Sequence, residues 1–204
     1  MYKDGLKRGI DFLLSLAGII VLSPILLILC IAIKIDSKGP VIFKQKRVGK
    51  NKTHFYIYKF RTMKVDTPQE TPTHLLSNPD FFITRVGKFL RKTSLDELPQ
   101  LFNILKGDMA VIGPRPALWN QYDLIEKRDK YHANDIRPGL TGLAQISGRD
   151  ELEIDYKARL DGQYTANITP MMDLKCFFGT IISVFKSEGV VEGGTGSAKK
   201  EDVK

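Results

Sequence analysis

Two adjacent carboxylates in the stretch SLDELPQ, residues 94–100, are the first candidates for chemistry. Ser94 and Glu97 have the spacing of a capping box, and Pro99 falls near the first turn, so Asp96 and Glu97 open a predicted helix. One interpretation is structural, because acids at a helix start complement its dipole. The other is chemical, because an ionised carboxylate beside free amides can serve as a nucleophile or as a ligand for Mg²⁺.

Arginines in two glycine- and proline-containing motifs favour the chemical interpretation. Arg115 stands between two prolines in VIGPRP, residues 111–116, where little backbone freedom remains. A rigidly held guanidinium suits bidentate phosphate binding. The stretch DIRPGLTGLAQISGR, residues 135–149, carries Arg137 and Arg149 around three glycines, where the backbone can approach a ligand closely. Singly, such arginines are more often surface ion-pair partners, but beside an acidic pair they indicate a phosphate site.

An uncharged apolar run of 22 residues, 12–33, points to a membrane. As one helix it would be ~33 Å long, enough to cross a hydrocarbon core of ~30 Å. Pro24 lacks an amide hydrogen and would clash with the carbonyl of Ile20, so we expect the helix to bend or break at Ser23–Pro24. The Ser23 hydroxyl can serve backbone groups that the break frees.

Basic residues flank this apolar run on both sides. Lys3, Lys7 and Arg8 precede it, and ten basic residues with one acid occupy residues 34–64. Because positively charged flanks stay in the cytoplasm, a re-entrant hairpin satisfies both flanks and a straight span does not. The residues alone leave both topologies open. The basic block, in a chain of net charge +8, suits anions such as nucleic acid, acidic lipid headgroups or a phosphorylated substrate.

The remaining sequence predicts an α+β fold that is mostly helical. Apolar and polar residues alternate around a Gly/Asn turn, which predicts a β-hairpin with strands near 41–47 and 54–60. Helical periodicity predicts helices at 85–92, 94–107, 117–131 and 151–164. Residues 171–186 predict an amphipathic helix that could lie at a membrane interface or pack on the domain. The expected organisation is a membrane helix (1–35), a cytoplasmic catalytic domain (36–188) and a disordered tail (189–204).

Several of these motifs together resemble the bacterial sugar transferase family, the monotopic phosphoglycosyl transferases. They are SLDELPQLFNILKGDM, VIGPRP, RPGLTGLAQISGR, KFRTM and the Ser-Pro pair, and the resemblance extends from about residue 7 to 184. It implies transfer of a sugar-1-phosphate from a UDP-sugar to undecaprenyl phosphate, with Mg²⁺ and release of UMP. It also implies a re-entrant membrane helix, a catalytic domain on the cytoplasmic face of the bacterial inner membrane, and no additional N-terminal membrane bundle.

The resemblance further implies roles for individual residues. Asp96 becomes the nucleophile of a ping-pong reaction through a covalent phosphosugar, with Glu97 as its partner and both as Mg²⁺ ligands. Five other residues match family positions and are expected to bind substrate: Lys59, Arg91, Arg115, Arg149 and Asp161. The sequence leaves open which sugar is transferred, the oligomeric state, and whether Glu97 binds metal or orients the acceptor.

A membrane-tethered binding module without catalysis is the alternative from another class. Basic residues interleaved with aromatic ones in residues 41–63 would suit acidic lipid or nucleic acid. This alternative leaves the acidic pair and the arginine motifs unexplained. A closer alternative is an enzyme that hydrolyses the phosphosugar or uses another lipid acceptor. We therefore expect a UDP-sugar, undecaprenyl phosphate and membrane lipids as partners, and no nucleic acid.

Overall fold

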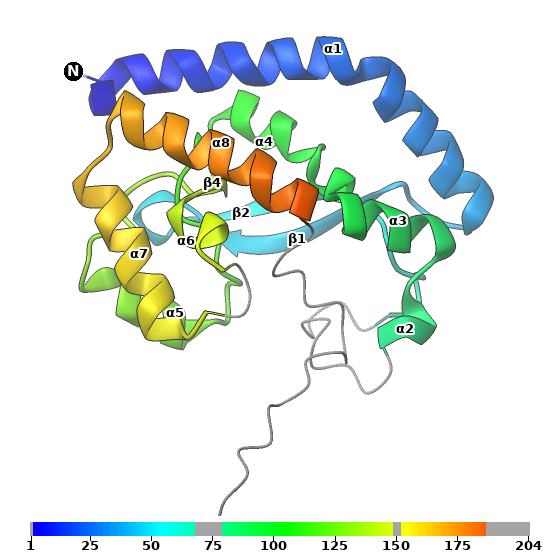
Figure 1. The fold of residues 1–204 in the computed structure, drawn as a ribbon. Coiled ribbons are helices and arrows are strands. Elements are labelled where there is room, and N and C mark those ends of the chain that lie inside the picture. Colours follow the sequence, from blue (N-terminus) through cyan, green and yellow to red (C-terminus); the bar gives the residue numbers. More distant parts are fainter. Residues whose placement is uncertain (1, 68–78, 149–151, 187–204) are drawn as a thin grey trace, which may run out of the picture.

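A long N-terminal helix lies along one side of the molecule, and the other elements gather beneath it (Figure 1). The computed structural model describes residues 2–67, 79–148 and 152–186 of the 204-residue chain. Within these ranges there are eight α-helices and two small two-stranded sheets. The predicted α+β class with mostly helical content is confirmed. The predicted tail, residues 189–204, lies outside the described ranges.

The N-terminal helix, α1 (Lys7–Asp36), is continuous through Ser23–Pro24 and follows a short π-helical turn, Tyr2–Leu6. Figure 1 shows that its axis changes direction part-way along. Because Pro24 has no amide hydrogen, the carbonyl of Ile20 loses its helical partner, and the Ser23 hydroxyl donates to that carbonyl at 2.8 Å. The structure agrees with the predicted bend and the predicted use of Ser23. The predicted break is wrong, because one hydroxyl satisfies the carbonyl that the proline frees.

Most apolar side chains of α1 face outward from the protein. Only five of its 30 residues are buried: Lys7, Asp11, Ser15, Leu29 and Ile33. At 1.5 Å per residue the helix is ~45 Å long. It is the one helix in the described part of the chain that is long and apolar enough to cross a membrane.

The predicted β-hairpin is confirmed as β1 (Ile42–Val48) and β2 (His54–Phe60), paired antiparallel. Ile57 of β2 is buried against helix α4 (Gln100–Lys106), in a cluster with Leu101 and Ile104. Asn103 of α4 binds the β2 backbone, because its side chain accepts from the amide of Tyr58 and donates to the carbonyl of Tyr56, at 2.9 and 2.8 Å. The hairpin is thus fixed to the helix that follows the acidic pair.

The structure corrects the predicted capping box at residue 94. Helix α3 (Arg85–Thr93) ends at Ser94, whose φ of 57° is left-handed and whose amide donates to carbonyls of α3. Its side chain makes no capping hydrogen bond, and a 3₁₀ turn, Leu95–Glu97, precedes α4. The turn residue therefore ends one helix instead of beginning another. The predicted end at Gly107 is confirmed, with a φ of 92° there.

A second sheet and five more helices complete the domain. Strands β3 (Ala110–Ile112) and β4 (Gly139–Thr141) pair in parallel, an element that the sequence did not predict. The helices are α5 (Tyr122–Asp129), α6 (Leu143–Ile146), α7 (Ile154–Ala166) and α8 (Pro170–Lys186), and a short α2 (Pro79–Phe82) precedes α3. Helix α5 begins later than predicted, because the chain before it is hydrogen bonded to β1 through the Ala117 carbonyl.

Candidate active site

The acidic pair lies on the 3₁₀ turn between α3 and α4, near the end of β2. Leu95 and Leu98 pack against an apolar cluster that includes Phe60 and Leu90, and this packing fixes the turn. The side chains of Asp96 and Glu97 remain only 13% and 17% exposed. Two charged groups are therefore largely removed from water, which lowers the stability of the fold unless they are paired with opposite charges or bind a ligand.

Glu97 is held by two cations on a single oxygen. Lys59 Nζ and Arg115 Nη2 both donate to Glu97 Oε1, at 2.8 and 2.9 Å. Burial alone would raise the pKa of Glu97, but the charges of Arg115 and Lys59 outweigh it and hold the pKa well below its usual range. Glu97 is therefore a fixed anion that brings together a lysine from β2 and an arginine from the segment after β3.

Asp96 has fewer partners than its neighbour. Among the described residues its ion pair is with Lys59, with Nζ 3.8 Å from Oδ2, beyond hydrogen-bond distance. Burial raises the pKa of Asp96, and the adjacent charge of Glu97 acts in the same direction. Environments that shift the pKa values of two neighbouring carboxyl groups in opposite directions are typical of sites in which each group has its own role. Asp96 is the carboxylate with oxygens available to a ligand.

Arg91 adds a third positive charge near Asp96, from the last turn of α3. Its Nε donates to Thr62 Oγ1 at 2.9 Å. Helix α3 approaches the chain after β2 very closely, since a Cβ at Gly87 would lie 2.0 Å from the Thr62 carbonyl oxygen. Only glycine allows this approach, which fixes the position of Arg91. Helix α3, which carries Arg91, is also bound to the end of α1, because Asp36, the last residue of α1, accepts a hydrogen bond from an α3 amide at 3.0 Å.

Arg61 connects the site to the end of the apolar helix. Its guanidinium donates to the carbonyls of Ser37 and Lys38, the two residues directly after α1. Lys59 lies two residues before Arg61 on the same chain segment. The site is therefore close to the C-terminal end of the helix that can enter a membrane.

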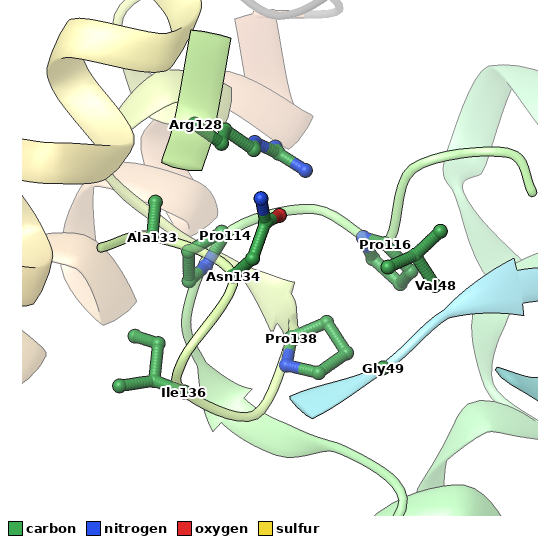
Figure 2. Close-up of a pocket in the computed structure, with 9 residues that line it drawn as sticks. All are labelled: Val48, Gly49, Pro114, Pro116, Arg128, Ala133, Asn134, Ile136 and Pro138. Carbon is green, nitrogen blue, oxygen red and sulfur yellow. The ribbon is translucent and has the colours of Figure 1, made fainter. Parts of the chain in front are cut away.

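The prolines on either side of Arg115 border a very small cavity (Figure 2). Pro114, Pro116 and Pro138 line this cavity with Arg128 and Asn134, and its volume is about 10 Å³. Such a volume holds about one water molecule and no substrate. The cavity is therefore too small to be a substrate-binding pocket.

The structure brings together most, but not all, of the predicted site residues. Asp96, Glu97, Lys59 and Arg115 are in contact, and Arg91 acts on Asp96 through its charge. Arg149 lies outside the described residues. The Asp161 side chain is 1% exposed on α7 and is bound by Arg128, so this placement does not support direct contact with a substrate. The metal role of the pair stays a prediction.

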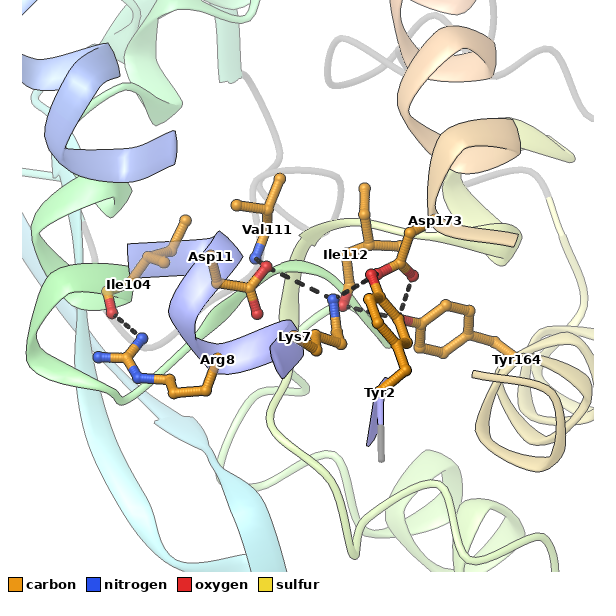
Figure 3. A network of polar contacts seen from close by, with 9 residues as sticks. All are labelled: Tyr2, Lys7, Arg8, Asp11, Ile104, Val111, Ile112, Tyr164 and Asp173. Carbon is orange, nitrogen blue, oxygen red and sulfur yellow. Dashed lines mark hydrogen bonds and ion pairs between the residues drawn. The ribbon is translucent and has the colours of Figure 1, made fainter. Parts of the chain in front are cut away.

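A second polar cluster, which the sequence did not predict, surrounds Lys7 at the start of α1 (Figure 3). Lys7 Nζ lies 2.8 Å from Asp173 Oδ2 and 3.4 Å from Asp11 Oδ1. The hydroxyls of Tyr2 and Tyr164 bind the two oxygens of Asp173, at 2.6 and 2.7 Å. We call these five residues the anchor cluster; it fastens α1 to the first turn of α8 and to α7.

Two further contacts extend the anchor cluster to the rest of the domain. Asp11 Oδ1 accepts a hydrogen bond from the amide of Val111 in β3, at 3.2 Å. Arg8 donates to the carbonyls of Ile104 and Leu105 at the end of α4, at 2.6 and 2.9 Å. The long helix is therefore fixed at its beginning by side chains that the apolar pattern alone would not single out.

Comparison with known proteins places these motifs in one family. The profile of the bacterial sugar transferase family matches residues 2–187. The chain is 41% identical over 190 residues to an exopolysaccharide production protein, PSS, of Rhizobium leguminosarum bv. phaseoli, covering 87% of this chain and 94% of the relative.

Longer relatives match as well. An undecaprenyl-phosphate galactose phosphotransferase of Salmonella typhimurium is 38% identical over 199 residues, 90% of this chain and 41% of the relative. A UDP-glucose:undecaprenyl-phosphate glucose-1-phosphate transferase of Klebsiella pneumoniae is 39% identical over 192 residues, 88% of this chain and 40% of the relative. The chain thus spans less than half of these longer proteins and nearly all of the Rhizobium relative. It belongs to the bacterial sugar transferase family.

Proposed function

We propose that the protein transfers a sugar-1-phosphate from a UDP-sugar to undecaprenyl phosphate and releases UMP, as an early membrane step in polysaccharide or glycoconjugate synthesis. The family and the printed activities of its relatives support this reaction class. The observation that carries it is the contrast within the acidic pair. Glu97 is bound by two cations on one oxygen, whereas Asp96 beside it keeps oxygens available.

In the first half-reaction, an Asp96 carboxylate oxygen attacks the phosphorus that carries the sugar. A new P–O bond forms, the bond to the uridine-bearing phosphate breaks, and UMP leaves with the electron pair. A carboxylate needs no base for this attack, and a desolvated one with few hydrogen bonds has lone pairs free. Lys59, Arg91 and Arg115 offset the charge that develops on the phosphates.

In the second half-reaction, a phosphate oxygen of undecaprenyl phosphate attacks the same phosphorus. The bond to Asp96 breaks and the carboxylate is regenerated. A covalent intermediate lets a water-soluble donor and a lipid acceptor use one site in turn. Glu97 keeps Lys59 and Arg115 at the spacing where both can contact phosphate oxygens.

The residues at the site fit Mg²⁺ when phosphate oxygens supply part of its coordination. Among the described residues, no group of three or more His, Cys, Asp or Glu side chains forms a complete metal site. Magnesium usually takes one or two carboxylates together with substrate phosphates and water. Asp96 is the better-placed ligand, since Glu97 Oε1 already binds two cations. Bound there, the ion would neutralise charge on the diphosphate during transfer.

We also propose that α1 is re-entrant: it enters the membrane from the cytoplasmic side, and both of its ends lie on that side. The bend in α1, the basic residues on both flanks and the exposed apolar side chains support this topology. Apolar side chains are also exposed on α8, as the amphipathic pattern predicts: Met171, Leu174, Phe177, Phe178, Ile181 and Ile182. These would lie at the interface, near the lipid acceptor.

Cysteine labelling tests the topology. In a background without Cys30 and Cys176, a Lys3→Cys variant should react with a membrane-impermeant maleimide only from the cytoplasmic side. Labelling of Lys3→Cys from the opposite side would favour a single span. Because the Lys3 side chain is exposed, the variant should leave the fold of the domain unchanged.

Release of UMP tests the reaction. Protein in nanodiscs with Mg²⁺ and undecaprenyl phosphate is given UDP-glucose, UDP-galactose and UDP-N-acetylgalactosamine in turn. One donor should give UMP together with a lipid-linked sugar diphosphate. Free sugar-1-phosphate as the product would indicate hydrolysis, and binding to vesicles without any UMP would favour the non-catalytic module.

A further inference from the structure

The segment that presents Arg115 is held through its backbone at four consecutive residues. Each carbonyl from Pro114 to Ala117 accepts a hydrogen bond from another part of the chain. The donors are the Gly139 amide (2.8 Å), Arg128 Nη1 (2.9 Å), Arg47 Nη1 (3.0 Å) and the Val48 amide (3.0 Å), in that order. The two prolines have no amide hydrogen of their own, so the segment depends on these acceptors for its position.

The donor to the Arg115 carbonyl is itself part of a buried ion pair. Arg128 on α5 donates through Nε and Nη2 to Asp161 Oδ2 on α7, with the Nε contact at 2.8 Å. Their side chains are 4% and 1% exposed. One edge of the guanidinium therefore binds Asp161, and the remaining nitrogen reaches the Arg115 carbonyl.

The buried pair is not explained by stability alone. Burying two charges costs desolvation energy, and apolar residues of similar size are often at least as stabilising in such a position. A guanidinium, however, has rigid, planar donors and can bind a carboxylate and a carbonyl in fixed directions at the same time. The distinguishing property of this pair is therefore geometrical.

We infer that Arg128, oriented by Asp161, is a positioning residue for Arg115. The Arg115 side chain is 40% exposed, and its Nη2 lies 2.9 Å from Glu97 Oε1, a contact that depends on where the backbone of the segment is held. Asp161 thus acts from behind the site, through Arg128. The consequence for catalysis rests on the proposed function, whereas the consequence for the segment does not.

The conservative variant Arg128→Lys separates positioning from folding. Lysine can still neutralise buried Asp161, but it lacks the fork that also reaches the Arg115 carbonyl. Thr165→Val is the matched control, because it removes a buried hydroxyl that binds the Asp161 backbone carbonyl on the same helix, at 2.8 Å, without contact to Arg115. Melting temperatures of both variants establish that they fold.

Amide hydrogen exchange measures the positioning directly, whatever the enzyme does. In the peptide covering residues 110–121, Arg128→Lys should exchange at least several-fold faster than wild type, and Thr165→Val should not. Unchanged exchange in folded Arg128→Lys would overturn the inference. This measurement stands even if wild type releases no UMP, an outcome that would defeat the proposed function alone.

A double-mutant cycle then measures the effect on the reaction. Loss of one hydrogen bond to a charged group corresponds to about a tenfold fall in kcat/KM for Arg128→Lys. In an Arg115→Met background the same change should have almost no further effect, since its target is gone. A tenfold fall in both backgrounds would show that Arg128 does not act through Arg115, and would overturn the inference.

Discussion

The active-site pair and the anchor cluster are built from the same parts, a lysine placed between two aspartate or glutamate side chains. Lys59 lies 3.8 and 2.8 Å from Asp96 and Glu97, and Lys7 lies 3.4 and 2.8 Å from Asp11 and Asp173. The two clusters differ in how many hydrogen bonds their carboxylates accept. That difference separates a site that reacts from one that holds the fold together.

In the anchor cluster every carboxylate is engaged by nearby donors. Asp173 accepts at both oxygens, from Lys7 and two tyrosines, and Asp11 accepts from a β3 amide as well as Lys7. In the active site, Asp96 has only the longer contact with Lys59 among the described residues. A buried carboxylate with few hydrogen-bond donors lowers the stability of the fold. Such groups are therefore expected at reactive sites and not in clusters that only stabilise the fold.

The largest effect should come from Asp96→Asn. The amide cannot form the acyl phosphate, so UMP release should fall about a thousandfold or more. Because the Asp96 carboxylate makes no close hydrogen bond with any residue that the structure describes, the melting temperature should change little. UMP release and thermal unfolding are measured on the same preparation, and a variant that keeps a tenth of the wild-type rate would show that Asp96 is not the nucleophile.

Asp173→Ala should act in the opposite way, on stability. It leaves Lys7 buried with one fewer partner and removes the acceptor for two tyrosines, so unfolding free energy should fall by about 3 kcal/mol. Activity per folded molecule should stay within about twofold. Chemical denaturation gives the stability, and UMP release corrected for the folded fraction gives the activity. A stable Asp173→Ala protein with strongly reduced turnover would mean that the two clusters are not functionally distinct.

Glu97→Gln sharpens the contrast within the active site. The amide still fills the space but no longer holds Lys59 and Arg115 by charge, so kcat/KM should fall about tenfold to a hundredfold. Steady-state kinetics should attribute much of this loss to a higher KM for the donor. A loss as large as that of Asp96→Asn would make Glu97 an equal candidate for the nucleophile.

The smallest effect is expected at Ser94, where the turn of the active site begins. Its φ of 57° is left-handed and its side chain makes no cap, so Ser94→Gly should stabilise the protein by about 0.5–1 kcal/mol. The capping-box interpretation predicts a small destabilisation instead, of about 0.3 kcal/mol, because glycine is itself a tolerated N-cap residue. Thermal unfolding distinguishes the two signs.

The elements that the sequence predicted well are those with local signals. Alternation gave the hairpin, and the amphipathic pattern of residues 171–186 agrees with α8. Pro24 predicted the bend in α1 and the use of the Ser23 hydroxyl, but the predicted break does not occur. In each case the residues that determine the structure lie within a few positions of one another.

The errors and omissions have a common physical origin in contacts between distant segments. Nothing local distinguishes a capping serine from Ser94 in a left-handed turn, since tertiary packing decides it. The pairs Lys7–Asp173 and Arg128–Asp161 are 166 and 33 residues apart, so no spacing indicated them. The parallel strands β3 and β4 are three residues each, too short for an alternating pattern.

The most direct test of the account is to look for the phosphosugar on Asp96. Protein in nanodiscs is mixed with the active UDP-sugar in the absence of lipid acceptor, quenched, and analysed by intact-protein and peptide mass spectrometry. We predict a mass increase of one sugar phosphate on the peptide that contains Asp96, which disappears when undecaprenyl phosphate is added and is absent in Asp96→Asn. Two results would contradict this account. One is UMP that forms only when the acceptor is present, with no adduct on the protein. The other is an adduct on a residue other than Asp96.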